Sequence, residues 1–215
     1  MPASKAALMN CGSPYANYLA THGVGASGTI IRFDPKEGKY RTAVEKREIA
    51  VGSQFVVVSS QIQGGWRKFM GEGNPPKRVQ GNLSEGYVPP ARDSLGDTDE
   101  SEWPVGKFSG KPEDPWQFEL LLPLQSVDDG QLYIFSTSTF GGRRAVDAVI
   151  AMCGVMHRAE PNDFPVVKLG VGGYQSKKFG WVKAPCFDRV GKSPKADTAA
   201  VNTSLADDMS DEIPF

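Results

Sequence analysis

Cationic and aromatic side chains alternate at three places in this 215-residue chain. Lysine and arginine hold phosphates, and bases stack on aromatic rings, so this combination is typical of a surface for single-stranded nucleic acid. Arg143 and Arg144 also open a predicted helix, where free backbone N–H groups favour an anion. The residues predicted to contact nucleic acid are Trp66, Arg67, Lys68, Phe69, Lys77, Arg78, Phe140, Arg143, Arg144, Tyr174, Lys177, Lys178, Phe179, Trp181 and Lys183.

Each aromatic residue in these clusters also has a plainer interpretation as part of the core, because aromatic side chains in strands are more often buried than exposed. The aromatic residues expected in the core are Phe33, Phe55, Trp116, Phe118, Tyr133 and Phe135. Burial and exposure stay equally open for those beside cations and glycines, which are Trp66, Phe69, Tyr174 and Trp181. If Phe179 and Trp181 share one face of a strand, they could stack on successive bases.

The last residues of the sequence combine acids with an apolar end. The acids are Asp207, Asp208, Asp211 and Glu212, and they precede Ile213, Pro214 and Phe215. Phe215 would fill an apolar pocket of a partner, a partner cation would hold the α-carboxylate, and the acids would meet a basic rim. Pro214 restricts the backbone and so lowers the cost of ordering the segment. The pattern predicts a partner-docking tip.

The net charge of −1 hides an uneven distribution. From Gly191 onward the chain carries two lysines against five acids, so the preceding part holds 22 basic and 20 acidic residues. A mildly basic body with an acidic end is compatible with binding a polyanion. Residues 191–215 are also poor in large apolar side chains until the tip, and we expect a disordered linker that ends in the acidic tip.

Short β-branched and aromatic runs between turn residues predict a mainly β fold. Strands are expected at 28–33, 49–62, 116–122, 132–137, 166–169 and 179–183, with a hairpin turn at 34–40 and a Gly-rich stretch at 170–174 between the last two strands. Apolar residues at three- to four-residue spacing predict one helix between Gly142 and His157.

Three further segments complete the expected organisation. Residues 64–115 are polar and rich in Gly, Pro and Asp, which indicates a functional insertion with short strands of its own. Residues 1–25 are small and polar, and are expected to form a flexible N-terminal arm before a domain of residues 26–190. About six strands and one late helix suit a closed β-barrel, for which the oligonucleotide-binding (OB) fold is the natural candidate. Strand count alone would equally permit a β-sandwich.

Residue types needed for catalysis do not assemble along the chain. His22 and His157 lie in no Cys/His or Ser/His constellation. The acids between Asp93 and Glu100 lack the ligand pattern of an EF-hand, and a solvated loop is the preferred interpretation. The Gly-rich stretch at 170–173 lacks the Lys-Ser/Thr of a P-loop. We therefore expect no enzyme activity, no cofactor and no metal.

Cysteine usage and hydropathy indicate the cellular setting. Cys11, Cys153 and Cys186 are odd in number and widely spaced, so free thiols in a reducing cytoplasm are preferred to disulfides or a zinc site. No apolar run is long enough to span a bilayer, and the N-terminus lacks the apolar region of a signal peptide. The sequence leaves open whether the chain forms a homo-oligomer.

Residues 207–215 resemble the acidic C-terminal tip of bacterial single-stranded DNA-binding proteins, which ends in Asp-Ile-Pro-Phe after several acids. Here Glu212 replaces the last Asp, and Met209-Ser210 interrupts the acidic run, which should weaken the contact with a basic rim more than the Phe anchor. In that family the tip recruits replication, recombination and repair enzymes and competes with DNA for the basic groove of the body.

The body resembles the OB-fold single-stranded DNA-binding proteins of tailed bacteriophages. The resemblance lies in two segments. Ser138 to Ala145 is a Ser/Thr-Gly-Gly element before an Ala-containing helix, and Tyr174 to Pro185 is a closing strand in which Tyr, Lys, Gly and Pro recur in that order with other residues between them. It implies sequence-independent binding of single-stranded DNA during replication and recombination, in the cytoplasm of a bacterium or an infected host. The main alternative is an adaptor or decoy, whose tip mimics the host tail to engage or block repair enzymes. A duplex- or RNA-binding module is a third interpretation.

Overall fold

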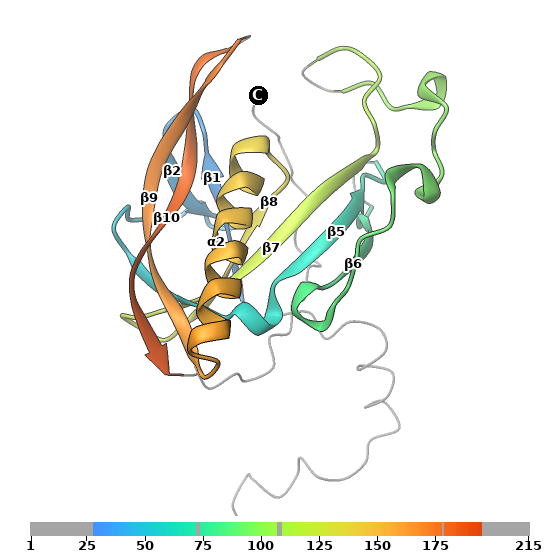
Figure 1. The fold of residues 1–215 in the computed structure, drawn as a ribbon. Helices are drawn as coiled ribbons and strands as arrows, with labels where there is room; N and C mark the ends of the chain where they lie inside the picture. The colour runs from blue at the N-terminus through green and yellow to red at the C-terminus, as the bar shows by residue number, and fades with distance from the viewer. Residues whose placement is uncertain (1–27, 72–73, 107–108, 178, 195–215) are drawn as a thin grey trace, which may run out of the picture.

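The computed structural model describes residues 28–71, 74–106, 109–177 and 179–194. Within these residues the chain forms one mixed sheet of ten strands and one α-helix (Figure 1). The strands are β1 (Thr29–Asp34), β2 (Lys39–Thr42), β3 (Glu48–Ile49), β4 (Gln54–Val57), β5 (Gln63–Lys68), β6 (Lys77–Asn82), β7 (Trp116–Ser126), β8 (Leu132–Thr137), β9 (Asp163–Ser176) and β10 (Gly180–Pro194). The helix is α2 (Phe140–Ala159), and short 3-10 turns are η2 (Ser59–Gln61), η3 (Leu83–Glu85), η4 (Arg92–Leu95) and η5 (Glu100–Glu102). The fold is mainly β with a late helix, as predicted.

The sheet runs in the order β10-β9-β4-β7-β8-β1-β2-β3 and curls into a half-barrel around α2 (Figure 1). β1 pairs with β8 in parallel, and the remaining strand pairs are antiparallel. β4 and β5 both pair with β7, so they act as two halves of one interrupted strand. No helix in the described part of the chain is long and apolar enough to cross a membrane.

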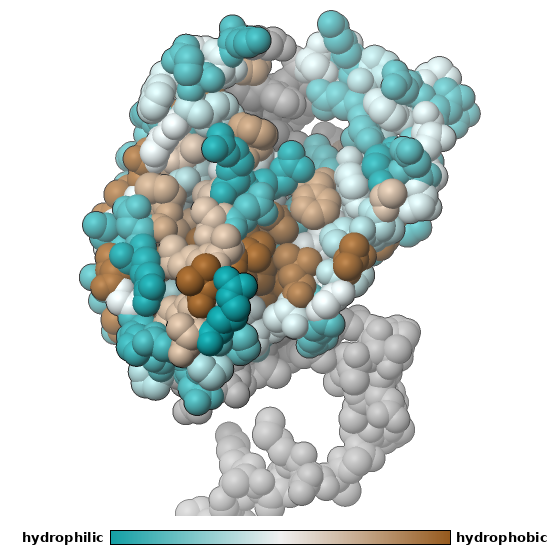
Figure 2. Space-filling model, in the orientation of Figure 1, coloured by the Kyte–Doolittle hydropathy of each residue, from teal (hydrophilic) through white to brown (hydrophobic). Residues whose placement is uncertain are grey.

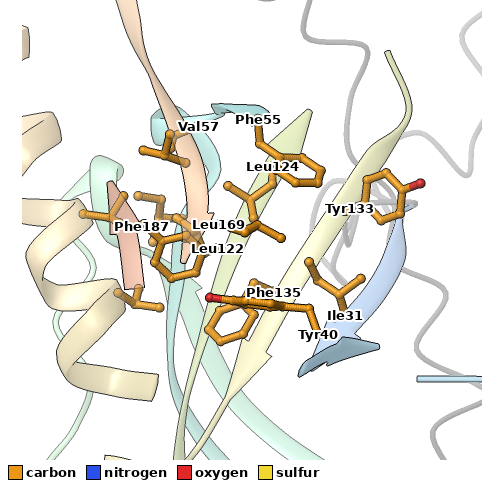
Figure 3. Close-up of a cluster of buried hydrophobic side chains, with 14 of the residues drawn as sticks. Ile31, Tyr40, Phe55, Val57, Leu122, Leu124, Tyr133, Phe135, Leu169 and Phe187 are labelled. Atoms are coloured by element: carbon orange, nitrogen blue, oxygen red, sulfur yellow. The ribbon is translucent and has the colours of Figure 1, made fainter. Parts of the chain in front are cut away.

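The core lies between the concave face of the sheet and α2. Alternate residues of β7 contribute Leu120, Leu122 and Leu124, because successive side chains in a strand point to opposite faces. Tyr40, Phe135 and Phe187 meet there with ring centroids between 5.2 and 6.4 Å apart (Figure 3). Burying each large apolar side chain contributes roughly 1.5–3 kcal/mol relative to exposure, which favours the curled sheet.

The burial of individual aromatic residues largely agrees with the expectations from sequence. Phe55, Trp116, Tyr133 and Phe135 are buried, as predicted. Phe33 and Phe118 are only partly buried and pack against the core from its margin.

Helix α2 extends slightly beyond the predicted residues at both ends. Thr139 caps its start, because its side-chain oxygen accepts a hydrogen bond from the Gly142 amide at 3.2 Å. Val146, Val149 and Met156 recur on one face and are buried against the sheet. His157 and Arg158 lie in the last turn, where cations are favourable.

The β1–β2 hairpin lies near one end of the curled sheet and contacts the β9–β10 end. The buried Tyr40 hydroxyl donates to the Gly170 carbonyl at 2.7 Å and approaches the Cys186 carbonyl at 3.2 Å. The Lys183 ammonium donates to the Glu37 carbonyl at 3.0 Å, in the turn between β1 and β2. These side chains join the β1–β2 end of the sheet to the β9–β10 end.

Three predicted boundaries are wrong. Residues 49–62 are not one strand: a turn at Gly52, with φ of +99°, separates β3 from β4, and η2 follows. The Gly-rich stretch at 170–174 lies inside β9, because glycine amides pair in a ladder as well as any others. The disordered linker does not begin at residue 191, since residues 191–194 belong to β10 and pair with residues 163–166. Lys192 also forms ion pairs with Glu160 and Asp163 there.

The predicted insertion, residues 64–115, does contain short elements of its own. β5 and β6 form a hairpin, and η3, η4 and η5 follow it. β5 also pairs with β7, so the first strand of the insertion is part of the main sheet.

Candidate nucleic-acid interface

Two segments flank the start of α2 (Figure 1). We call residues 64–115 the insertion arm, and the paired residues 170–176 and 180–186 of β9 and β10 the hairpin arm. In the space-filling view, hydrophilic side chains cover the outer parts of both arms, and apolar surface lies around α2 between them (Figure 2). The described nucleic-acid-binding residues predicted from sequence are divided between the two arms and the first turn of α2.

Arg143 joins the first turn of α2 to the insertion arm. Its guanidinium carbon lies 5.9 Å from the centroid of the Phe118 ring on β7. Phe118 is the cross-strand partner of Trp66, and the two rings meet edge to face at 5.4 Å. The Trp66 indole is held in turn, because its N–H donates to the Pro90 carbonyl at 2.9 Å. We call Trp66, Phe118 and Arg143 the insertion-side unit.

Phe140 joins the same turn of the helix to the hairpin arm, and Arg144 lies over its ring. The Arg144 guanidinium carbon is 5.7 Å from the centroid of Phe140, a residue that is 55% exposed. Phe140 meets Tyr174 of β9 edge to face at 5.4 Å. We call Phe140, Arg144 and Tyr174 the hairpin-side unit. Adjacent arginines of one helical turn therefore each lie over one ring of a different aromatic pair.

Two glycines allow the elements to approach one another at the start of α2. A side-chain carbon at Gly141 would lie 2.9 Å from the Ala184 side chain and 3.1 Å from the Tyr174 ring. A side chain at Gly142 would clash with Thr137 and Thr139. The Gly141-Gly142 pair thus lets both β8 and the hairpin arm pack against the helix N-terminus.

The insertion arm is fastened to the sheet around Trp116. The Asp97 carboxylate accepts hydrogen bonds from the Lys68 ammonium and from the Trp116 indole, each at 2.8 Å. The hydrogen bond from Lys68, followed by that from Trp116, lowers the pKa of Asp97. Lys68 and Lys77 also lie over the Trp116 ring at 5.9 and 5.8 Å.

A second ion pair closes the base of the insertion arm. Arg92 binds both carboxylate oxygens of Asp114, at 2.6 and 2.7 Å, and donates to the carbonyls of Gly96 and Asp97. Burial would raise the pKa of Asp114, but hydrogen bonds from Arg92 and from the Trp116 amide outweigh it and lower that pKa. The ionised forms of Asp97 and Asp114 therefore hold the loop in place.

Arg67 and Arg78 lie on the opposite face of the sheet from Trp66. Strand alternation turns them toward Glu119, which is 3% exposed, and their Nε atoms lie 3.9 Å from its carboxylate oxygens. Gln80 and Ser136 donate to the same carboxylate at 2.8 and 2.9 Å. The two arginines neutralise a buried acid, and a contact with nucleic acid stays a prediction for them.

The hairpin arm presents its predicted residues on two different faces. Tyr174 and its cross-strand partner Val182 face α2, so Trp181 and Lys183 lie on the other face. Trp181 is 65% exposed and Phe179, next to the turn, is 61% exposed. Lys177 is exposed, and Lys183 donates to the β1–β2 turn. Phe69 is 55% exposed at the end of β5.

Several predictions concern residues outside the described part of the chain. These are the side chain of Lys178, the N-terminal arm at 1–25, and the partner-docking residues Asp207, Asp208, Asp211, Glu212, Ile213, Pro214 and Phe215. Phe118 was expected in the core and was missed as a partner of Arg143, although its alternation with Trp116 on one strand was a usable signal. Asp97 was missed as well, because its acidic loop has the composition of a solvated one.

The described histidines, cysteines and acids do not meet the requirements of a metal site. Among them, no group of three or more His, Cys, Asp or Glu side chains could hold a metal ion. Burial raises the pKa of the Cys153 thiol to about 11 and also raises that of Cys186, so both thiols are protonated at neutral pH.

Comparison with known proteins gives no match: no family model, no curated protein and no solved structure matches this chain significantly. The geometry of the described residues and the sequence pattern therefore support the functional proposal by themselves.

Proposed function

We propose that this protein binds single-stranded DNA without sequence preference, at the start of α2 and along the two flanking arms. The observation that carries the proposal is the pair of cation–aromatic units, in which Arg143 and Arg144 each lie over one aromatic ring that in turn meets a second ring. Sequence-tolerant binding needs cations for phosphates and aromatic faces for bases, and each unit supplies both.

The geometry of each unit is compatible with simultaneous contact to backbone and base. A guanidinium stacked on a ring binds phosphate through its planar edge, so stacking does not consume its charge. The backbone N–H groups of the first helical turn add to the attraction for a phosphate between the arms. The exposed Phe140 ring and the half-buried Trp66 ring are the candidate stacking surfaces.

The order of elements supports an OB barrel as the scaffold. Counting β4 and β5 as one interrupted strand, the chain forms a meander with β7 and β8, then α2, then the β9–β10 hairpin. This is the order of a five-stranded OB barrel, to which the β1–β2 hairpin is added. In OB folds the loop after the first strand and the loop of the last hairpin bind oligonucleotides. Here these are residues 69–115 of the insertion arm, which follow β5, and the turn of the hairpin arm.

The acidic tip gives the proposed protein its second activity. Residues 207–215 would recruit replication, recombination or repair enzymes through Phe215 and the terminal carboxylate, in the cytoplasm of a bacterium or infected host. The acids of the tip would compete weakly with DNA for the basic interface.

Titration with oligo-dT tests the proposal. Binding should quench tryptophan fluorescence, weaken as salt rises, and be stronger than binding to a duplex of the same length. Quenching that is absent, or that does not respond to salt, would contradict the proposal.

Deletion of residues 211–215 separates DNA binding from the adaptor or decoy alternative. A DNA-binding protein keeps or gains affinity for oligo-dT when the competing acids are removed, and loses only enzyme recruitment. A decoy has no affinity for oligo-dT with or without these residues, and loses its partner on deletion.

A further inference from the structure

The hairpin arm has two faces, and the proposed interface uses one of them. Tyr174 turns toward Phe140, and the Tyr174 ring approaches Gly141 at the start of α2. Trp181 follows on the opposite face of the ribbon, because it neighbours Val182, the partner of Tyr174. The largest exposed aromatic side chain of the hairpin arm therefore faces away from the first turn of α2.

The Trp181 indole packs on the backbone of Gly173. A side-chain carbon at Gly173 would lie 2.6 to 2.8 Å from three atoms of the indole, so the ring covers the bare backbone of that glycine. One side of the ring is thus supported by β9, and the side chain is still 65% exposed. A flat ring that is fixed on one side and open on the other is a stacking surface that loses little freedom on binding.

The surroundings of Trp181 suit nucleic acid. Phe179 is exposed two residues before it, at the turn, and Lys177 lies exposed at the same end of the arm. Lys183 lies on the same face as Trp181, further from the turn. Apolar rings between cations match a base surface bordered by phosphates.

The hairpin arm extends beyond its neighbouring strand. β9 pairs with β4 through residues 166–168, and the described residues beyond Leu169 pair only with β10. At about 3.3 Å per residue, the ribbon from Gly170 to Ser176 is roughly 20 Å long. The hairpin arm thus has two accessible faces. The Tyr174 face lies on the proposed interface, and the opposite face, which we call the Trp181 face, does not.

We propose that the Trp181 face of the hairpin arm binds the end of a duplex that adjoins the bound single strand, with Trp181 stacked on the terminal base pair. This proposal rests on the proposed function, since the single strand would lie on the α2 side of the same arm. A terminal base pair presents an uncovered flat surface, and the arm separates it from the strand held beside α2. The substrate class is therefore a junction between single-stranded and double-stranded DNA.

Competition between two labelled DNAs tests this proposal with the full-length protein. One is oligo-dT, and the other is a duplex with an oligo-dT overhang and a fluorescent base analogue in its terminal base pair. The wild type should prefer the junction and change the fluorescence of the analogue. Trp181→Ala should reduce this preference about tenfold, because it should lose far more affinity for the junction than for oligo-dT.

Two further variants guard against indirect effects. Gly173→Ala keeps the indole but displaces it from the backbone on which it packs, and should also lower the junction preference. Val190→Ala, an exposed position of β10 outside the arm, should change neither DNA.

The outcomes distinguish this proposal from the proposed function. Equal losses on both DNAs for Trp181→Ala would overturn it and make Trp181 an ordinary contact of the single strand. Binding of oligo-dT without junction preference would overturn it and leave single-strand binding intact. Failure to bind either DNA would overturn both.

Discussion

The two arms beside α2 are fastened in different ways. The insertion arm is held by charged groups, with Asp97 bound to Lys68 and Trp116, and with Arg92 bound to Asp114. The hairpin arm is joined to the β1–β2 hairpin by the Tyr40 hydroxyl and the Lys183 ammonium, and its aromatic end is exposed. We therefore expect the insertion arm, which is held by ion pairs, to be more rigid than the hairpin arm, whose aromatic end is exposed. Variants that loosen one arm at a time test this difference in rigidity.

Removal of Arg92 should have the largest effect. Arg92→Ala eliminates a bidentate ion pair and two hydrogen bonds to carbonyls, and should lower the free energy of unfolding by about 2 kcal/mol. Amide exchange should rise in residues 83–115 and not in the hairpin arm. Urea unfolding and hydrogen exchange measure the two quantities. Asp93→Ala, an exposed acid of the same loop, is the matched control.

Loss of the Tyr40 hydroxyl should loosen the hairpin arm. Tyr40→Phe keeps the buried ring and leaves the Gly170 carbonyl without this donor, which should cost about 1 kcal/mol. Exchange should rise in the hairpin arm and stay low in the insertion arm. Increased exchange in both arms would mean that the hydroxyl supports the whole core instead.

Acid should loosen the insertion arm before the hairpin arm. The folded-state pKa values of Asp97 and Asp114 are lowered, so the stability they provide is present above their unfolded pKa of about 4 and is lost as the pH falls through the folded values. Burial raises the pKa of the Tyr40 hydroxyl, so this donor to the hairpin arm keeps its proton in acid. Fluorescence of a Trp181→Phe variant, which retains tryptophans of the insertion arm, should change below about pH 4 before global unfolding. A simultaneous transition of both arms would remove the distinction.

The contact of Lys183 with the β1–β2 turn should contribute less stability than those of Arg92, Asp97 and Tyr40. Its side chain is exposed, so Lys183→Met should change the free energy of unfolding by less than about 0.5 kcal/mol. Exchange should increase only near the β1–β2 turn. A larger loss in urea unfolding would show that the contact is needed to hold the two ends of the curled sheet together.

Much of the fold follows from local patterns in the sequence. The apolar and aromatic runs at 116–122 and 132–137 predict β7 and β8, and the helical spacing after Gly142 predicts α2. The broken strand at 49–62 was missed although Gly52 marks the turn, because the β-branched residues beside it dominate the pattern. The end of β10 was missed because its small polar residues pair through their backbone.

The candidate interface was only partly predictable. Neighbours in the run Trp66-Arg67-Lys68 were treated as one cluster, but strand alternation divides them between two faces. Which face is concave depends on the curl of the whole sheet, and so does the burial of Glu119 between Arg67 and Arg78. The pairing of Arg143 with Phe118 and of Phe140 with Tyr174 requires the helix to be placed against the sheet and the hairpin arm.

The salt dependence of oligo-dT binding by Arg143→Ala/Arg144→Ala tests the central claim most directly. Its control is Arg158→Ala/Arg189→Ala, which removes the same charge from exposed positions away from the interface. If the two units hold the single strand, only the first variant loses affinity, and its slope of log K against log salt falls by roughly 0.7 for each phosphate contact removed. Equal affinities and equal slopes for the two variants would contradict the account.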